Sequence, residues 1–399
     1  MRILDLHFLR PASICLVLVF SLFVSSCIND KEKYPADYDN IPELVSIQFN
    51  KEDDRDLSIS DLFTHVSLIP LDNTDSAYIH PGVPIRLAIS NDSFFILEKG
   101  NREEVFVFNK DGSFQRCLNH KGRGPGEYLI PTDILINHYS QSLDVLTVDG
   151  KIISYSLDNL EFQNEILLNN RNSLYDNFIL INNHKYVLYS RDSFNLSVLD
   201  SRNNSHTIID YKIPTWLQLS VYSVKRSSNP LLAPTKEKHP LFFEGWSGIL
   251  LSIDIDSSAT TPYMKFDFGK NNLSITKLEP NKDAFYYYNF MKNNTFRFVG
   301  PFTSVLSINS KYYINYIFKG IYYTLIYDCI SNKYDVIDFT KEGLSIPIGY
   351  SDGESLYEIA DPKFLSSFVN ESVLDDNNQF ILQSLSEDSN LVIIKYDIK

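Results

Sequence analysis

A glycine-rich turn, Gly122–Tyr128, combines backbone freedom with charged side chains. Backbone N–H groups in such turns can cradle phosphate, and Lys or Arg side chains bind anions. The turn lacks the Gly-Lys-Ser/Thr of a P-loop and the spacing of a dinucleotide-binding loop. It therefore predicts first a sharp connection between strands, and second a ligand site formed by Lys121, Arg123 and Glu127 at the mouth of a central channel.

Residue types of hydrolytic and metal chemistry are present, but their spacing selects no site. The segment Gly245–Gly248 is one residue short of the G-x-S-x-G elbow of serine hydrolases. Asp254 and Asp256 lack the further ligands and the glycine of a calcium loop. The histidines are scattered singly. We therefore assign no catalytic residue, no metal and no cofactor, and an enzyme is the less favoured reading.

Trp246 closes the aromatic run Leu241–Trp246. An exposed indole there would form a platform for a sugar ring or a peptide, whereas core packing is the default role of such a run. Trp246 is the fourth candidate ligand-binding residue.

The N-terminus has the layout of an export signal. Arg2 and Arg10 precede an apolar run too short to span a bilayer. The sequence Val24–Cys27 resembles a bacterial lipobox, which predicts cleavage of residues 1–26 and acylation of Cys27, with palmitate among the acyl chains. Residues 27–61 then form a lipidated tether. Asp30 and Glu32 loosely fit the acidic pattern that sends some lipoproteins to the cell surface.

The charge and the cysteine content of the chain limit the kinds of partner and of covalent cross-link that can be expected. The formal net charge of -14 and the lack of a Lys/Arg cluster exclude nucleic acid as an expected partner. Once the signal and the anchor are set aside, Cys117 and Cys329 remain. Two free thiols are favoured over a disulfide, which this compartment permits.

The stretch from about Leu62 to Lys399 is punctuated β-structure, with short aromatic and β-branched runs bounded by turn residues. Asp111-Gly112 and Asp149-Gly150 are hairpin dipeptides 38 residues apart, about the length of one propeller blade. The fold class is therefore all-β: a β-propeller of four-stranded antiparallel blades over residues 62–399, for which this length allows six or seven blades. A pair of β-sandwiches or a β-solenoid are the rival architectures.

Closure of the ring and two insertions can also be placed. We expect Val66–Pro70 to pair with Val392–Tyr396, which removes exposed sheet edges. The strand Phe380–Leu382 is expected to pair with Leu391–Tyr396. Short helical insertions are expected within Lys277–Asn294 and over Asp361–Val369, where Asp361 is a candidate N-cap and Pro362 the first helical residue.

The segment from Phe106 to Phe114, together with the turn Gly122–Tyr128, resembles the six-bladed β-propeller lipoproteins of Gram-negative anaerobes. These are relatives of the NHL and TolB-type propellers. The ending Asn390–Tyr396 is also similar to their closing strand. The resemblance covers nearly all of the mature chain, and it implies a six-bladed propeller and an envelope location rather than an activity.

The predicted function is a membrane-anchored, extracytoplasmic binding module on an outer-membrane lipoprotein. Its partners would be the lipid bilayer and a glycan, a peptide or an envelope protein. The alternative is a hydrolase or lyase with a dispersed carboxylate/His site at the central channel. Ionisable side chains with perturbed pKa values at the channel would favour the enzyme. An apolar groove on one loop face would favour binding.

Overall fold

The computed structural model describes residues 43–47, 57–168, 174–190, 196–209, 232–233, 239–243, 248–272, 286, 289–290, 293–294, 296–300, 302–346 and 349–399. The chain divides into the units Met1–Asn40 and Ile41–Lys399, and all described residues belong to the second. Among them, no helix is long and apolar enough to cross a membrane.

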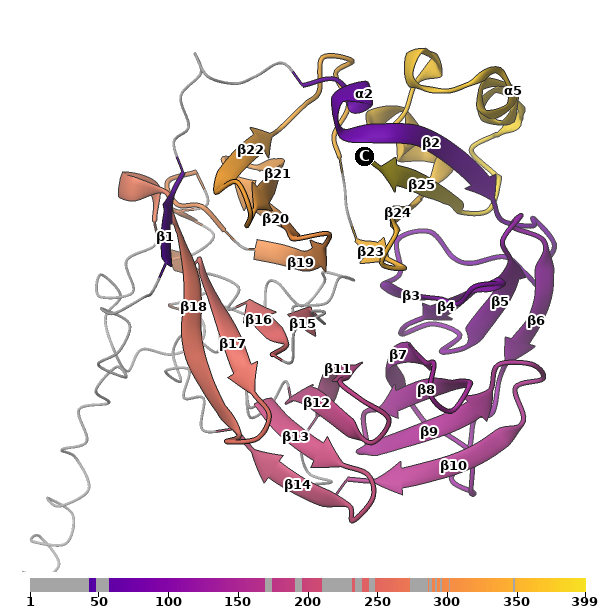
Figure 1. Ribbon diagram of the computed structural model, residues 1–399. Helices are drawn as coiled ribbons and strands as arrows, with labels where there is room; N and C mark the ends of the chain where they lie inside the picture. Colours follow the sequence, from indigo (N-terminus) through magenta and orange to yellow (C-terminus); the bar gives the residue numbers. More distant parts are fainter. Residues whose placement is uncertain are drawn as a thin grey trace, which may run out of the picture. The chain divides into compact units, whose positions relative to one another are not determined.

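Six sheets stand around a common axis, which confirms the six-bladed β-propeller (Figure 1). Each blade has four antiparallel strands, which run in chain order from the axis outward in blades 1 to 5, whereas blade 6 takes its outermost strand from the N-terminal part of the unit. Blades 1 to 3 comprise β3 (Ile85–Ile89), β4 (Ser93–Glu98), β5 (Val105–Asn109) and β6 (Phe114–Leu118); β7 (Pro131–Asn137), β8 (Ser142–Thr147), β9 (Lys151–Ser156) and β10 (Phe162–Leu167); and β11 (Tyr175–Leu180), β12 (Lys185–Ser190), β13 (Leu196–Asp200) and β14 (Ser205–Ile208).

The remaining blades include the two termini of the described unit. Blades 4 to 6 comprise β15 (Leu232–Ala233), β16 (Leu241–Phe243), β17 (Ile249–Asp254) and β18 (Ala259–Asp267); β19 (Phe302–Ile308), β20 (Lys311–Phe318), β21 (Ile321–Asp328) and β22 (Lys333–Ile337); and β23 (Tyr350–Ser351), β24 (Ser355–Ala360), β25 (Val392–Ile398) and β2 (Phe63–Pro70). A fifth strand, β1 (Glu43–Ser46), lies parallel to β18 on blade 4. Part of the segment predicted as tether therefore belongs to the propeller.

The hydrophobic core lies between blades rather than inside any one of them. Phe94, Ile96 and Phe106 of blade 1 pack against Tyr357 and Ile393 of blade 6. The alternate residues of β4 and β5 face blade 2 instead. Because both faces of these middle strands are buried, β4 is buried at all six positions, and such strands read as continuous apolar runs.

Closure of the ring follows the predicted register. Val66 pairs with Tyr396 and Pro70 with Val392 in the antiparallel ladder between β2 and β25. Strand β2 is thus the outer strand of blade 6, whose other three strands come from the C-terminal part of the chain. This arrangement joins the chain ends through backbone hydrogen bonds and leaves no open ring.

One predicted strand is wrong. Phe380–Leu382 lies in the helix α5 (Asp376–Ser384), and β25 pairs with β24 and β2 instead. The Asp375 carboxylate accepts a hydrogen bond from Asn378 N at 2.8 Å and caps the helix. A short apolar run cannot by itself distinguish a strand from a helix. Here the Asp375 cap favours the helix.

The blade spacing was inferred from two turns that prove not to be equivalent. Asp111-Gly112 joins the two outer strands of blade 1, whereas Asp149-Gly150 joins the two middle strands of blade 2. Gly112 and Gly150 both have positive φ, +89° and +76°. The same turn chemistry serves either connection, so the turns indicate hairpins without giving their place in the blade.

Short helices complete the fold: α2 (Ile59–Leu62), η3 (Gly269–Asn271), η5 (Pro362–Ser367) and η6 (Glu371–Val373). The predicted helix at Asp361–Val369 is confirmed as η5, a 3-10 helix, with Asp361 accepting a hydrogen bond from Lys363 N. Most of Lys277–Asn294 lies outside the described residues.

Candidate functional site

The glycine-rich turn between β6 and β7 is built by its own hydrogen bonds. Glu127 Oε2 accepts from Gly124 N at 2.7 Å, and Glu127 N donates to Gly124 O at 3.1 Å. A Cβ on Gly122 would lie 1.9 Å from Glu127 Oε2. The Glu127 carboxylate therefore fills the space that a larger residue at position 122 would need, and it closes the turn.

Two buried tyrosines hold this turn on the body of the propeller. Tyr128 Oη donates to Leu118 O, and Tyr155 Oη donates to Gly126 O, both at 2.8 Å. Burial raises the pKa of both phenols, so they remain neutral donors. Gly126 has φ +71°, and a Cβ there would meet the Phe162 ring at 2.7 Å. These contacts give the turn a structural role.

The four residues predicted from sequence as ligand-binding are not gathered into one cluster of described contacts. Lys121 pairs with Glu103 at 3.2 Å. Arg123 is exposed, and Glu127 is engaged within the turn. Trp246 lies outside the described residues, as does the lipidation site Cys27. A ligand role for these residues stays a prediction.

A charged cluster that sequence reasoning missed lies where the innermost strands of blades 1 to 3 begin. Arg86 of β3 and Asp133 of β7 form an ion pair, with Arg86 Nε 3.2 Å from Asp133 Oδ1. Their side chains are only 6% and 9% exposed. Asn177 of β11 donates from Nδ2 to Asp133 Oδ2 at 3.1 Å. One cluster thus connects three successive blades beside the axis.

Backbone irregularities set the direction of these side chains. The ladders of blades 2, 3 and 5 each shift register at the start of the innermost strand, at Thr132, Asp176 and Thr303. A bulge places an extra residue in one strand and re-aims the side chain that follows. Asp133 and Asn177 are the residues that follow the first two bulges.

Asp133 is held by donors on both carboxylate oxygens. Oδ1 accepts from Ile134 N at 3.0 Å and faces Arg86, and Oδ2 accepts from Phe178 N at 3.2 Å as well as from Asn177. Burial raises the pKa of Asp133, and the Arg86 guanidinium opposes that shift. With both oxygens engaged, this carboxylate is poorly placed to take a proton from a substrate.

Arg86 is the member of the cluster with unused hydrogen-bonding capacity. Among the described residues its Nη1 is buried and has no hydrogen-bond partner. A second, longer ion pair completes the cluster: Lys99 Nζ lies 3.8 Å from Asp176 Oδ1, and these side chains are 19% and 17% exposed. The formal charges of the two pairs cancel.

Other ionisable groups of blade 1 are engaged in structural contacts. Glu104 pairs with Arg102 at 2.9 Å and accepts from Asn119 Nδ2 at 2.6 Å. Cys117 lies beside it, and burial raises the pKa of this thiol to about 12, which disfavours the reactive thiolate form. Cys117 and Cys329 are not joined by a disulfide. In the described part of the chain, no group of His, Cys, Asp and Glu could hold a metal ion.

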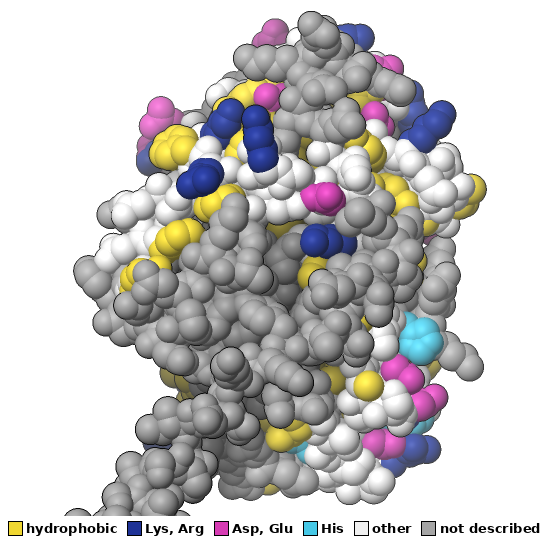
Figure 2. Space-filling view, turned by 90° about the vertical axis from the view of Figure 1, so that its left-hand side faces the viewer, with side chains coloured by type: hydrophobic (Ala, Val, Ile, Leu, Met, Phe, Trp, Pro, Cys, Tyr) yellow, Lys and Arg dark blue, Asp and Glu magenta, His cyan; other side chains and the backbone are white. Residues whose placement is uncertain are grey.

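Surface charge is mixed on the face that Figure 2 shows. Lys and Arg side chains there lie near Asp, Glu and hydrophobic side chains.

Solved structures resemble this chain. A protein titled "Putative exported protein" from Bacteroides fragilis is 18% identical, with a TM-score of 0.64, covering 89% of this chain and 99% of its own. A DUF4221 family member from Bacteroides vulgatus is 10% identical, with a TM-score of 0.49 and coverage of 85% and 97%. Virginiamycin B lyase from Staphylococcus aureus is 10% identical, with a TM-score of 0.44 and coverage of 84% and 99%. At 18% identity the likeness to the first of these structures concerns the fold alone.

Sequence comparison gives the family. No curated protein matched the chain. The profile of the domain of unknown function DUF4934 matches residues 44–397, which begin within β1 and end within the closing strand β25. This span contains the whole closed propeller. Because the profile covers most of the chain, the chain belongs to the DUF4934 family.

Proposed function

We propose that this protein is a lipid-anchored, extracytoplasmic binding module that holds an uncharged, oxygen-rich ligand, a glycan or a peptide, against the inner strands of blades 1 to 3. The observation that supports this most directly is the buried Arg86 Nη1 without a hydrogen-bond partner. A buried N–H left unpaired costs about 1–3 kcal/mol. A ligand oxygen that accepts from it recovers that free energy on binding.

The charges of the cluster favour an uncharged ligand. Arg86 is already balanced by Asp133, and Lys99 by Asp176. A ligand carboxylate would add a buried charge without a counter-charge, which is costly. Carbonyl and hydroxyl oxygens, as in sugars and peptide bonds, accept the same hydrogen bond without that cost.

The state of Asp133 favours binding over hydrolysis or elimination. An acid–base mechanism needs a carboxylate that can reach a substrate proton. Asp133 has the raised pKa typical of such a group, but both of its oxygens already accept hydrogen bonds from the protein. The cluster therefore offers a donor to a ligand, while Asp133 is engaged by the protein and poorly placed to act as a base.

Ligand binding can be tested with two matched arginine variants of the mature full-length protein. Arg86→Lys keeps the positive charge beside Asp133 and removes Nη1. Arg202→Lys changes another Asp-paired arginine, on the β13–β14 turn, where Arg202 Nη2 lies 2.7 Å from Asp200 Oδ2. The probes are an array of neutral oligosaccharides and an array of acetylated, amidated pentapeptides.

We expect at least one neutral probe to bind wild type and Arg202→Lys equally, and Arg86→Lys at least tenfold more weakly. Urea midpoints of the three proteins report whether each variant is folded. Equal binding to Arg86→Lys, or no neutral probe binding wild type, would reject the axial site.

The proposed location is the outer membrane, with Cys27 as the acylated residue. It is supported by the lipobox-like Val24–Cys27 and by the shared fold with a protein titled as exported. Cys27→Ala should move the protein out of the washed membrane fraction, whereas Cys15→Ala, within the expected signal, should leave it there. Retention of the Cys27→Ala protein in the outer-membrane fraction would contradict the anchor.

A further inference from the structure

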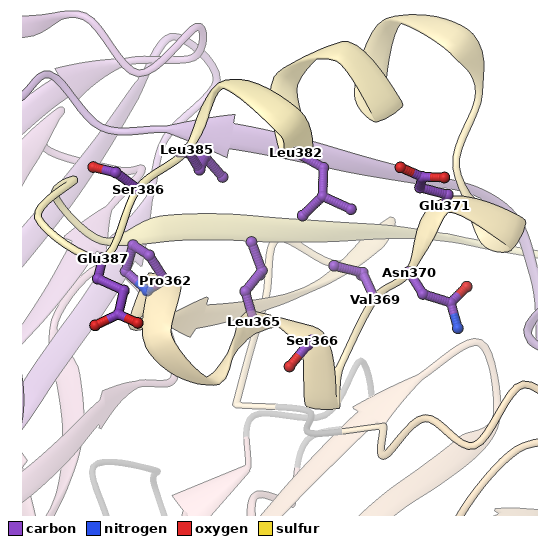
Figure 3. A pocket seen from close by; sticks show the side chains of 10 residues that line it. All are labelled: Pro362, Leu365, Ser366, Val369, Asn370, Glu371, Leu382, Leu385, Ser386 and Glu387. Atoms are coloured by element: carbon purple, nitrogen blue, oxygen red, sulfur yellow. The ribbon is translucent and has the colours of Figure 1, made fainter.

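The connection between β24 and β25 forms a groove that the axial cluster does not involve. The connection between the two middle strands is a short turn in blades 1 and 2, residues 99–104 and 148–150. In blade 6 the same connection is the long insertion 361–391. This insertion contains η5, η6 and α5. Between them lies a groove of about 390 Å³ (Figure 3).

The floor of the groove is apolar and fixed. Leu365 of η5 and Leu382 of α5 point toward one another across it, and Val369 and Leu385 lie beside them (Figure 3). Leu365 and Val369 are 2% and 1% exposed and belong to the core between blades 5 and 6. The floor is therefore part of the folded core rather than a loose surface.

Hydrogen bonds hold the walls in place without a ligand. Asn378 Oδ1 of α5 accepts from Leu68 N of β2 at 2.7 Å. Gln379 Nε2 donates to Glu371 O at 2.9 Å and so joins α5 to η6. Preformed walls lower the entropic cost of binding, so the groove is ready to accept a partner.

The rim of the groove is acidic at both ends. Glu371 stands at one end and Glu387 at the other (Figure 3), and both are exposed. Across the insertion, residues 361–391, six acidic residues accompany a single basic residue, Lys363. An apolar floor between two carboxylates is complementary to an apolar segment flanked by positive charges.

We infer that this groove docks a segment of a partner protein in which one or two apolar side chains are flanked by Lys or Arg. The apolar side chains lie over Leu365 and Leu382, and the flanking cations face Glu371 and Glu387. A second copy of this chain is a poorer occupant, because each copy has a net charge of -14 and two such surfaces repel each other. This inference does not depend on the axial site.

The test uses the mature full-length protein and two synthetic twelve-residue peptides that share a central Leu-Ala-Ala-Leu. In one peptide Lys flanks this core on both sides, and in the other Glu does. Binding is measured by fluorescence anisotropy at 50 and 300 mM NaCl. The variant Glu371→Lys/Glu387→Lys reverses the charge of the rim, and Glu354→Lys, on the β23–β24 turn, is the matched control.

We expect wild type and Glu354→Lys to bind the Lys-flanked peptide at least tenfold more tightly than the Glu-flanked one, with a smaller ratio at the higher salt. The rim variant should prefer the Glu-flanked peptide. Because Glu371 and Glu387 are exposed, this variant should fold, and its urea midpoint checks that. The inference would be overturned if the rim variant kept the wild-type preference, or if neither peptide bound. It would also be overturned if wild type were a dimer that the rim substitutions dissociate, since the groove would then hold a second copy of the chain.

Discussion

Removing the Asp133 carboxylate should destabilise the propeller far more than removing an exposed carboxylate. In Asp133→Ala, Arg86 would keep its charge in a site where its side chain is only 6% exposed. The N–H groups of Asn177 and Phe178 would lose their acceptor as well. Breaking a buried ion pair by deleting one partner costs about 3–5 kcal/mol. Domains are typically stable by about 5–15 kcal/mol, so we expect a folded but weakened protein.

A matched pair and a double variant separate the charge effect from general damage. Asp256 likewise pairs with a basic residue, here Lys185 at 3.3 Å, but its side chain is 92% exposed. Asp256→Ala should therefore cost about 1 kcal/mol or less. Arg86→Met/Asp133→Leu removes both buried charges and should be more stable than Asp133→Ala by at least about 1 kcal/mol. Urea unfolding of the mature protein, followed by tryptophan fluorescence, measures all four proteins.

Two results would refute this reasoning. A loss below about 1 kcal/mol in Asp133→Ala would mean that Arg86 finds water or another partner at little cost. A double variant no more stable than Asp133→Ala would mean that the lost hydrogen bonds to Asn177 and Phe178, rather than the unpaired charge, dominate the effect.

Three further predictions concern the scaffold. Gly126→Val should lower stability by about 1–3 kcal/mol or more, because φ is +71° and the new Cβ would meet Phe162, whereas the exposed Arg123→Ala should stay within about 0.5 kcal/mol in the same urea assay. Burial raises the pKa of Glu358 from about 4.5 to about 7. Between these pH values the folded state keeps a proton that the unfolded state has lost. The free energy of unfolding should therefore fall as pH rises from about 4.5 to 7, by at most about 3 kcal/mol. Glu358→Gln should flatten that part of the pH profile, and an unchanged profile would exclude Glu358 as its cause. Truncation after Asn390 removes β25 and should abolish cooperative thermal unfolding; a truncated protein that melts like wild type would show that closure is dispensable.

Much of the fold could be predicted from local pattern. Middle strands buried on both faces, such as Ser93–Glu98, appear as apolar runs, and Asp-Gly pairs mark hairpins because glycine accepts positive φ. The closing ladder between Val66–Pro70 and Val392–Tyr396 could be placed because a ring must pair its first and last strands. The function of the turn Gly122–Tyr128 as a connector also has a local cause, since its glycines and Glu127 bond to one another.

The candidate sites were decided by the tertiary structure. Arg86 stands alone within the apolar run Ile85–Ile89, and Asp133 within Thr132–Ile136. A charge inside a strand is a signal of a buried pair, but the partner can be named only when two blades are set side by side and bulges re-aim the side chains. The groove depends on α5, where Phe380–Leu382 had been expected as a strand. Its walls are fixed by contacts such as Asn378 to Leu68, 310 residues apart. Patterns in sequence report the local preferences of the backbone, whereas pairing between blades depends on distances that only the closed ring defines.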